Sequence, residues 1–117
     1  MSAFNLVEIR STCPACGAFA AIECQAHVAA LYDGPYSAIF DLGRHVIGQP
    51  FLVQPLNIVN IGSWLESVKG KSARECCYAE CDVCHAELFA VIEFDEFTPA
   101  RVVQVGLEVD WPAEYER

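Results

Sequence analysis

Apolar and polar residues alternate along several stretches of the chain, which is the pattern of half-buried β-strands. Residues 4–10 are rich in apolar and β-branched side chains and predict a strand leading into the first pair of cysteines. Between 19 and 31 the even positions are small or apolar, whereas Glu23, Gln25 and His27 fall on the other face. This second stretch predicts one long strand.

A turn and a returning strand are expected next. The residues Asp33-Gly34-Pro35 have turn chemistry, and residues 36–42 predict a strand that ends at Gly43. Together with the preceding strand they predict a β-hairpin built on the first cysteine pair. Residues 48–62 are apolar but interrupted by prolines, which predicts a buried and irregular connection.

One short helix is expected in an inserted region of about residues 44–75, which separates the first predicted hairpin from the second cysteine pair. The sequence Ser-Trp-Leu-Glu at residues 63–66 has the form of a capping box, in which the serine and glutamate side chains satisfy backbone amides at a helix start. The pattern predicts a helix from Ser63 to Lys69 that is stopped by Gly70.

The remaining chain again predicts strands. Residues 73–80 lead into the second cysteine pair, and residues 86–95 alternate as another long strand. Thr98-Pro99 is expected to break the pattern. The inner face of a last strand would carry Val103, Val105, Leu107 and Val109. The predicted fold is therefore mainly β, made of antiparallel β-hairpins in a sheet, and the tail 110–117 is expected to fray or lie on the surface.

The length of 117 residues fits one domain, so residues 1–117 are expected to fold as a single unit. No stretch has the pattern of a secretory signal peptide, and no apolar run approaches the length that spans a bilayer. We therefore expect a cytoplasmic protein without a membrane partner.

Seven cysteines include two C-x-x-C pairs, Cys13/Cys16 and Cys81/Cys84. An odd number at this tight spacing favours metal binding over a disulfide framework. Two cysteines separated by two residues can reach one ion from a single turn, and zinc prefers four such ligands in a tetrahedron. We expect these four to hold one structural zinc ion. An iron centre of the rubredoxin kind, which uses the same ligands, is the alternative.

The sequences C-P-A-C-G at residues 13–17 and C-D-V-C at residues 81–84 resemble the knuckles of the zinc-ribbon family, which clamp one zinc ion at the ends of β-hairpins. The resemblance covers residues 13–42 and 80–109 and implies an elaborated zinc-ribbon-like domain. Two features differ from the family. A stretch of 64 residues separates the two pairs, and His85 stands where the first knuckle has a glycine.

The other cysteines and the histidines carry no catalytic motif. Cys24 is expected to lie in the core, and the adjacent Cys76 and Cys77 to pack on opposite strand faces, although replacement of a ligand by one of them stays open. The histidines are scattered at His27, His45 and His85. Four cysteines close a zinc shell, so the interpretation is a protein that is not an enzyme. A redox or metal-dependent enzyme using the remaining thiols is a third hypothesis.

The chain is acidic, with 16 acidic against 7 basic residues and a formal charge of −9. Four thiolates and one zinc ion would bring this to about −11. Such a charge repels phosphate and attracts basic partners, which disfavours direct nucleic-acid binding. We expect a protein partner with a basic surface, by analogy of size and charge with immunity proteins and antitoxins. The alternative is a zinc-ribbon factor associated with nucleic acid or transcription machinery, although the basic residues cluster only at Lys69, Lys71 and Arg74.

Acidic residues gather in the C-terminal third, where aromatic residues are interleaved with them. The simpler interpretation is a solvated face that keeps the domain soluble. The alternative is a docking surface on which aromatic side chains act as anchors. The candidate anchors are Phe89, Phe94, Phe97, Trp111 and Tyr115.

Overall fold

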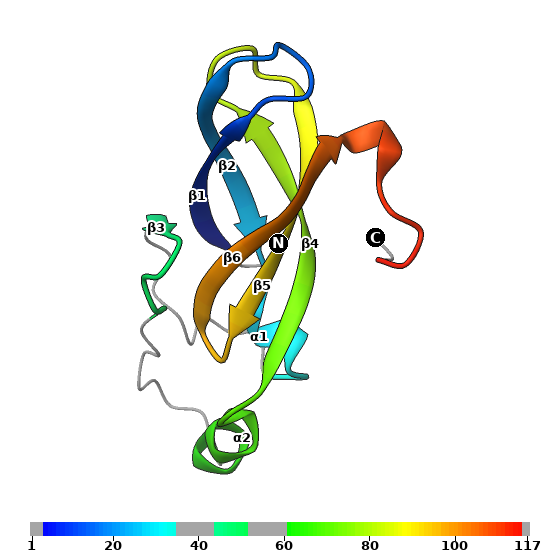
Figure 1. The fold of residues 1–117 in the computed structure, drawn as a ribbon. Helices are drawn as coiled ribbons and strands as arrows, with labels where there is room; N and C mark the ends of the chain where they lie inside the picture. Colours follow the sequence, from blue (N-terminus) through cyan, green and yellow to red (C-terminus); the bar gives the residue numbers. More distant parts are fainter. Residues whose placement is uncertain (1–3, 35–43, 52–60, 116–117) are drawn as a thin grey trace.

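The computed structural model describes residues 4–34, 44–51 and 61–115, and within these residues the fold is mainly β, as predicted (Figure 1). One curled, mixed sheet has the strand order β3-β1-β2-β4-β5-β6. Its strands are β1 (Asn5–Thr12), β2 (Phe19–Ala26), β3 (Arg44–Val46), β4 (Ser72–Cys81), β5 (Glu87–Asp95) and β6 (Thr98–Leu107). Neighbouring strands are antiparallel except β1 and β3, which are parallel.

Two β-hairpins carry the two cysteine pairs in their turns. β1 pairs with β2 so that Thr12 lies opposite Phe19, and β4 pairs with β5 so that Glu80 lies opposite Glu87. The first pair is therefore the turn of the β1–β2 hairpin, whereas the sequence predicted a hairpin formed after it. The predicted returning strand at 36–42 lies outside the described residues.

The predicted long strand from 19 to 31 is wrong in its last third. β2 ends at Ala26, and a short helix, α1 (Val28–Leu31), follows. The backbone N–H of His27 donates to both carboxylate oxygens of Glu75, at 2.9 and 3.0 Å, so it no longer takes part in strand pairing. A contact with a residue far along the chain therefore overrides the local alternation.

The same contact makes the charge of His27 depend on Glu75. A hydrogen bond from the ring Nδ1 to Glu75 Oε2, 3.4 Å long, raises the pKa of His27 above 6.5, against the opposing effect of partial burial. A raised folded-state pKa stabilises the fold below the unfolded pKa, and this contribution is lost as pH rises through the folded pKa. An NMR titration of the His27 ring should give a pKa above 6.5 that falls in Glu75→Gln. Equal values in the two proteins would contradict this assignment.

The inserted region contributes helix α2 (Ile61–Val68), which begins two residues before the predicted start. Ser63 therefore lies inside the helix and is not its cap. Gly70 follows the helix with a φ of +75°, which confirms the predicted stop. Trp64 anchors α2 to the end of α1 and to the β5–β6 turn, because its indole N–H donates to the Tyr32 carbonyl at 2.8 Å and its ring packs on Phe97. No helix in the described part of the chain is long and apolar enough to cross a membrane.

The final strand differs from its prediction in two ways. The preceding run does end before Thr98, as predicted, but Pro99 itself lies in β6, where it is tolerated because β6 is an edge strand. Irregularities in the β5–β6 register skip Val103, so that Val102 packs on the core together with Val105 and Leu107. Val109 belongs to the 3-10 turn η1 (Glu108–Asp110) and is 83% exposed, so its predicted inner position is wrong.

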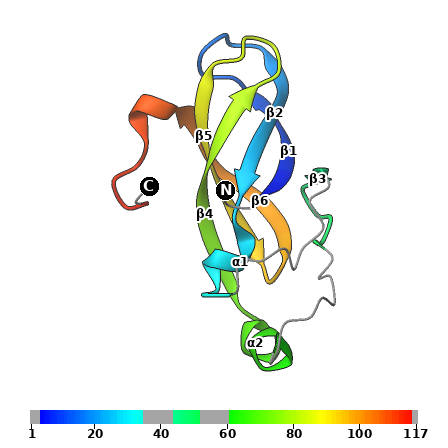
Figure 2. The ribbon, with the colours of Figure 1, turned by 180° about the vertical axis from the view of Figure 1, so that it is seen from behind.

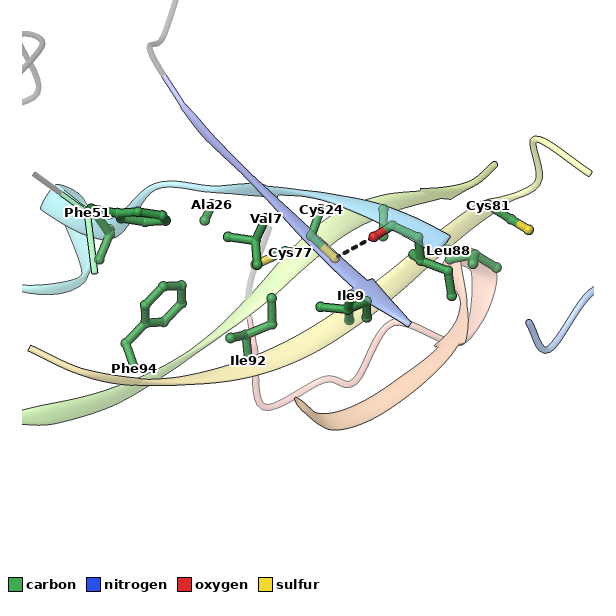
Figure 3. Packing of buried hydrophobic residues seen from close by; sticks show 14 of the residues in the cluster. Val7, Ile9, Cys24, Ala26, Phe51, Cys77, Cys81, Leu88, Ile92 and Phe94 are labelled. Carbon is green, nitrogen blue, oxygen red and sulfur yellow. Dashed lines mark hydrogen bonds between the residues drawn. The ribbon is translucent and has the colours of Figure 1, made fainter. Parts of the chain in front are cut away.

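The core lies on the concave side of the curled sheet (Figure 3). Its side chains on β2 and β4 are mostly small, which allows the sheet to curl until β1 approaches β6. Cys24 and Cys77 are buried there, as expected for Cys24. Larger side chains fill the space between the strands: Val7, Ile9, Ile22, Leu88, Ile92 and Phe94.

The other face of β5 is also buried, because the C-terminal segment folds against it. The Trp111 ring packs on Phe89 with ring centres 6.2 Å apart, so this part of the predicted surface tail is docked. A β-carbon on Gly106 would lie 2.6 Å from Cζ of Phe89, so only glycine leaves room for this ring. Phe89 and Phe94 are thus core residues and not interface anchors, while Trp111 stays half-buried.

Candidate metal centre

The structure brings the four predicted cysteines together at one end of the sheet. The sulfur atoms of Cys13, Cys16, Cys81 and Cys84 all lie within 4.8 Å of one another. Antiparallel pairing of β2 with β4, with Ile22 opposite Cys81, is what places the two hairpin turns side by side (Figures 1 and 2). A cluster of residues 71 positions apart in sequence is therefore fixed by the central register of the sheet.

The first knuckle, residues 13–17, is held by its own backbone. Gly17 donates its N–H to the Cys13 carbonyl at 2.9 Å, and Cys13 donates to the Ala18 carbonyl at 2.8 Å. The Ala15 N–H points at Cys13 Sγ from 3.3 Å. These bonds close a tight turn that presents both sulfur atoms on one side, and backbone N–H groups of this kind stabilise thiolates.

The second knuckle, residues 81–85, repeats this pattern without a glycine. His85 donates its N–H to the Cys81 carbonyl at 2.9 Å, and the Val83 N–H lies 3.4 Å from Cys81 Sγ. His85 reaches the turn with a φ of +58°, close to the +76° of Gly17. Histidine tolerates this left-handed conformation better than most residues, so the two knuckles bend alike despite the sequence difference.

The dimensions of the cluster fit a tetrahedral metal ion. With zinc–sulfur bonds of about 2.3 Å, two sulfur ligands of a tetrahedron are about 3.8 Å apart. Cys13 Sγ and Cys84 Sγ are 3.8 Å apart. Within each pair the first cysteine is buried and the second is exposed, so the site lies at the surface end of the core. Such a set of four thiols can bind a metal ion such as zinc.

The thiols of the cluster differ in acidity because of their local surroundings. Burial raises the pKa of Cys13, but N–H groups of Cys16 and Ala15 and the thiols of Cys81 and Cys16 outweigh it and bring the pKa to about 7. For Cys84 the Ala86 N–H lowers the pKa, whereas burial and the neighbouring thiols raise it to about 11. Metal binding displaces the protons that remain.

The remaining three cysteines lie outside the cluster, and no histidine of the described residues is one of its members. Cys24 and Cys77 are buried, and Cys76 is half-buried on the opposite face of β4. None of the three joins the four-sulfur group among the described residues. The ring of His85 turns to Glu80, with Nδ1 3.0 Å from the carboxylate, and both side chains are exposed. Neither of the open ligand substitutions at Cys76 or Cys77 is seen.

No protein family, no curated protein and no solved structure matches the chain. The cluster of four cysteines on two alike turns is consistent with a zinc-knuckle site.

Proposed function

We propose that the four-cysteine cluster holds one zinc ion as a structural staple in a protein that is not an enzyme. Two like turns supply all four ligands, so the tetrahedral shell is closed and leaves no position for a substrate. The ion ties the β1–β2 hairpin to the β4–β5 hairpin at the end of the sheet where β2 begins and β4 ends. Zinc is preferred to iron because a closed thiolate shell without redox chemistry suffices for this role.

We further propose that the protein acts by binding a basic protein partner, in the manner of an immunity protein or antitoxin. The observation that carries this proposal is the state of its cations. Within the described residues, carboxylates pair with four of the basic side chains: Arg44, Lys69, Arg74 and Arg101. Two of the three residues in the basic cluster noted in the sequence are among them, Lys69 with Glu66 and Arg74 with Glu93.

Paired cations contribute little attraction to a phosphate backbone, whereas the excess of carboxylates remains available. Long-range attraction therefore favours a positively charged partner and rapid association at low salt. The alternative, a zinc-ribbon factor that touches nucleic acid, would need cations that are free to meet phosphates.

Two binding experiments on the zinc-loaded protein test this proposal. Labelled double-stranded DNA and RNA should show no binding at about 50 mM salt, where electrostatic contacts are strongest. Cross-linking in cells followed by reconstitution with the purified partner should give a basic protein whose affinity falls as salt rises. Salt-sensitive binding of DNA or RNA, or a direct partner with an acidic surface, would contradict the proposal.

Thiol reactivity checks both the staple and the absence of a reactive cysteine. Burial raises the pKa of Cys24 to about 12, and burial also raises the pKa of Cys77 well above its usual value, so neither forms a thiolate readily. In the zinc-loaded protein a thiol reagent should label Cys76 alone, and Cys76→Ser should remove that labelling. After denaturation with a chelator, all seven cysteines should react. Rapid labelling of the folded Cys76→Ser protein would show that a cluster thiol is free or a core thiol is accessible.

A further inference from the structure

A cleft separates the C-terminal segment from the sheet on the convex side. Its volume is about 580 Å³. Its walls come from β4, from the end of β2 and the adjoining α1, and from the segment after η1. The residues of the wall that matter here are His27, Arg74, Glu75, Tyr78, Trp111 and Glu114.

The positive groups in this wall are already engaged. The Arg74 guanidinium lies 3.1 Å from a Glu93 carboxylate oxygen, and the His27 ring is held by Glu75. Glu75 in turn accepts the His27 backbone N–H with both oxygens. Neither cation is therefore available to attract an anion into the cleft.

One negative group in the wall, Glu114, has no partner in the part of the chain that the structure describes. Glu114 is exposed, and no hydrogen bond or ion pair joins it to another residue in 4–34, 44–51 or 61–115. Glu114 lines the cleft together with the aromatic residues Trp111, Tyr115 and Tyr78. Tyr115 lines the same cleft, and the Trp111 indole N–H donates to the Tyr115 carbonyl at 2.6 Å, which fixes the orientation of the indole. Tyr78 lines the cleft from β4.

Aromatic faces next to a carboxylate form a recognition site for a cation, because the ring quadrupole and the charge attract the same ligand. A guanidinium fits best, since it is planar, stacks on an indole and donates two parallel hydrogen bonds to a carboxylate. The Trp111 ring is also held in place before binding, because it packs on Phe89. Little conformational freedom is then lost when a ligand enters.

We propose that this cleft binds an arginine side chain presented by the partner protein, with Trp111 stacking on the guanidinium and Glu114 accepting its hydrogen bonds. The identity of the partner rests on the proposed function, whereas recognition of the guanidinium rests on the cleft alone. The overall negative charge steers the basic partner toward the protein, and the cleft recognises one of the partner's arginine side chains.

The test uses the whole zinc-loaded chain and a small probe, N-acetyl-arginine amide, at low salt. The NMR signal of the Trp111 indole N–H should shift as the probe is added, with a dissociation constant on the order of millimolar for a ligand of this size. The Trp64 indole signal should not move, which provides an internal control. The uncharged citrulline analogue should bind at least tenfold more weakly. Equal binding of the citrulline or lysine analogue would overturn the assignment of a guanidinium site.

Two variants with the same change of charge locate the site. Glu114→Gln should weaken binding of the probe at least fivefold, whereas Glu66→Gln, on α2 and outside the cleft, should leave it unchanged. Both residues are exposed, so neither change should disturb folding. Equal losses would show a diffuse charge effect and overturn the proposal. Partner binding that is unaffected in Glu114→Gln would overturn the cleft as the docking point without affecting the basic-partner proposal, which fails separately if no basic partner binds.

Discussion

Replacing Cys84 by serine is expected to remove the bound zinc ion and to lower the melting temperature by on the order of 10–20 °C. The free energy of zinc binding is available only to the folded chain, because the unfolded chain does not hold four thiolates together. Cys84 is exposed, so its sulfur contributes little to packing. The loss of stability therefore reports the loss of the ion and not of a core contact.

Cys76→Ser provides the matched control for this variant. It makes the same chemical change at a half-buried cysteine outside the cluster and should keep about one zinc ion per chain with a melting temperature near that of the parent. The measurements are metal content after gel filtration and thermal unfolding followed by circular dichroism. Cys13→Ser should lose zinc as well and be less stable than Cys84→Ser, since Cys13 is buried.

Removal of the metal should reproduce the effect without a substitution. A chelator should lower the melting temperature of the parent protein and leave that of Cys84→Ser unchanged, because a ligand stabilises only a protein that binds it. A Cys84→Ser protein that retains one equivalent of zinc and the parent melting temperature would show that the ligands are misassigned.

The local parts of this site could be predicted from the sequence, because they depend on residues a few positions apart. The C-x-x-C spacing determines how each turn presents its sulfur atoms, and Gly17 allows the bend of the first turn. What brings the turns together is the register between β2 and β4, with Ile22 opposite Cys81. Alternation of apolar residues indicates which face of a strand is buried, but not which strand lies beside it.

The sequence-based prediction of the fold was wrong at positions where a long-range contact determines the conformation. Val28 and Ala30 continue the alternating pattern of β2, yet the N–H of His27 donates to Glu75 and a helical turn begins. Val103 fits an alternating strand in the sequence, but an irregularity in the β5–β6 register leaves it without a paired residue on β5. The cleft was not predicted at all, because it forms only when Trp111 packs on Phe89. In each case a long-range contact decides a conformation that the local sequence leaves open.

The concave core should dominate the stability of the sheet, and Phe94 offers the sharpest test. Its side chain is fully buried and packs near Phe51, with ring centres 6.1 Å apart (Figure 3). Phe94→Ala is expected to lower the free energy of unfolding by about 3–5 kcal/mol, because it removes apolar burial and leaves a cavity that the curled strands cannot close. Urea unfolding of the zinc-loaded protein measures this loss.

Phe19→Ala makes the same substitution on another strand where the ring is 70% exposed. It should cost less than about 1 kcal/mol, since only the strand preference of the residue is lost. Because Phe19 lies two residues after the first knuckle, this variant also tests whether the zinc site tolerates a change near it, and its metal content should equal that of the parent. Similar losses of unfolding free energy from the two substitutions would mean that the concave face is not the core. If the difference between the two losses changed on removal of zinc, the metal site and the core would act as one cooperative unit.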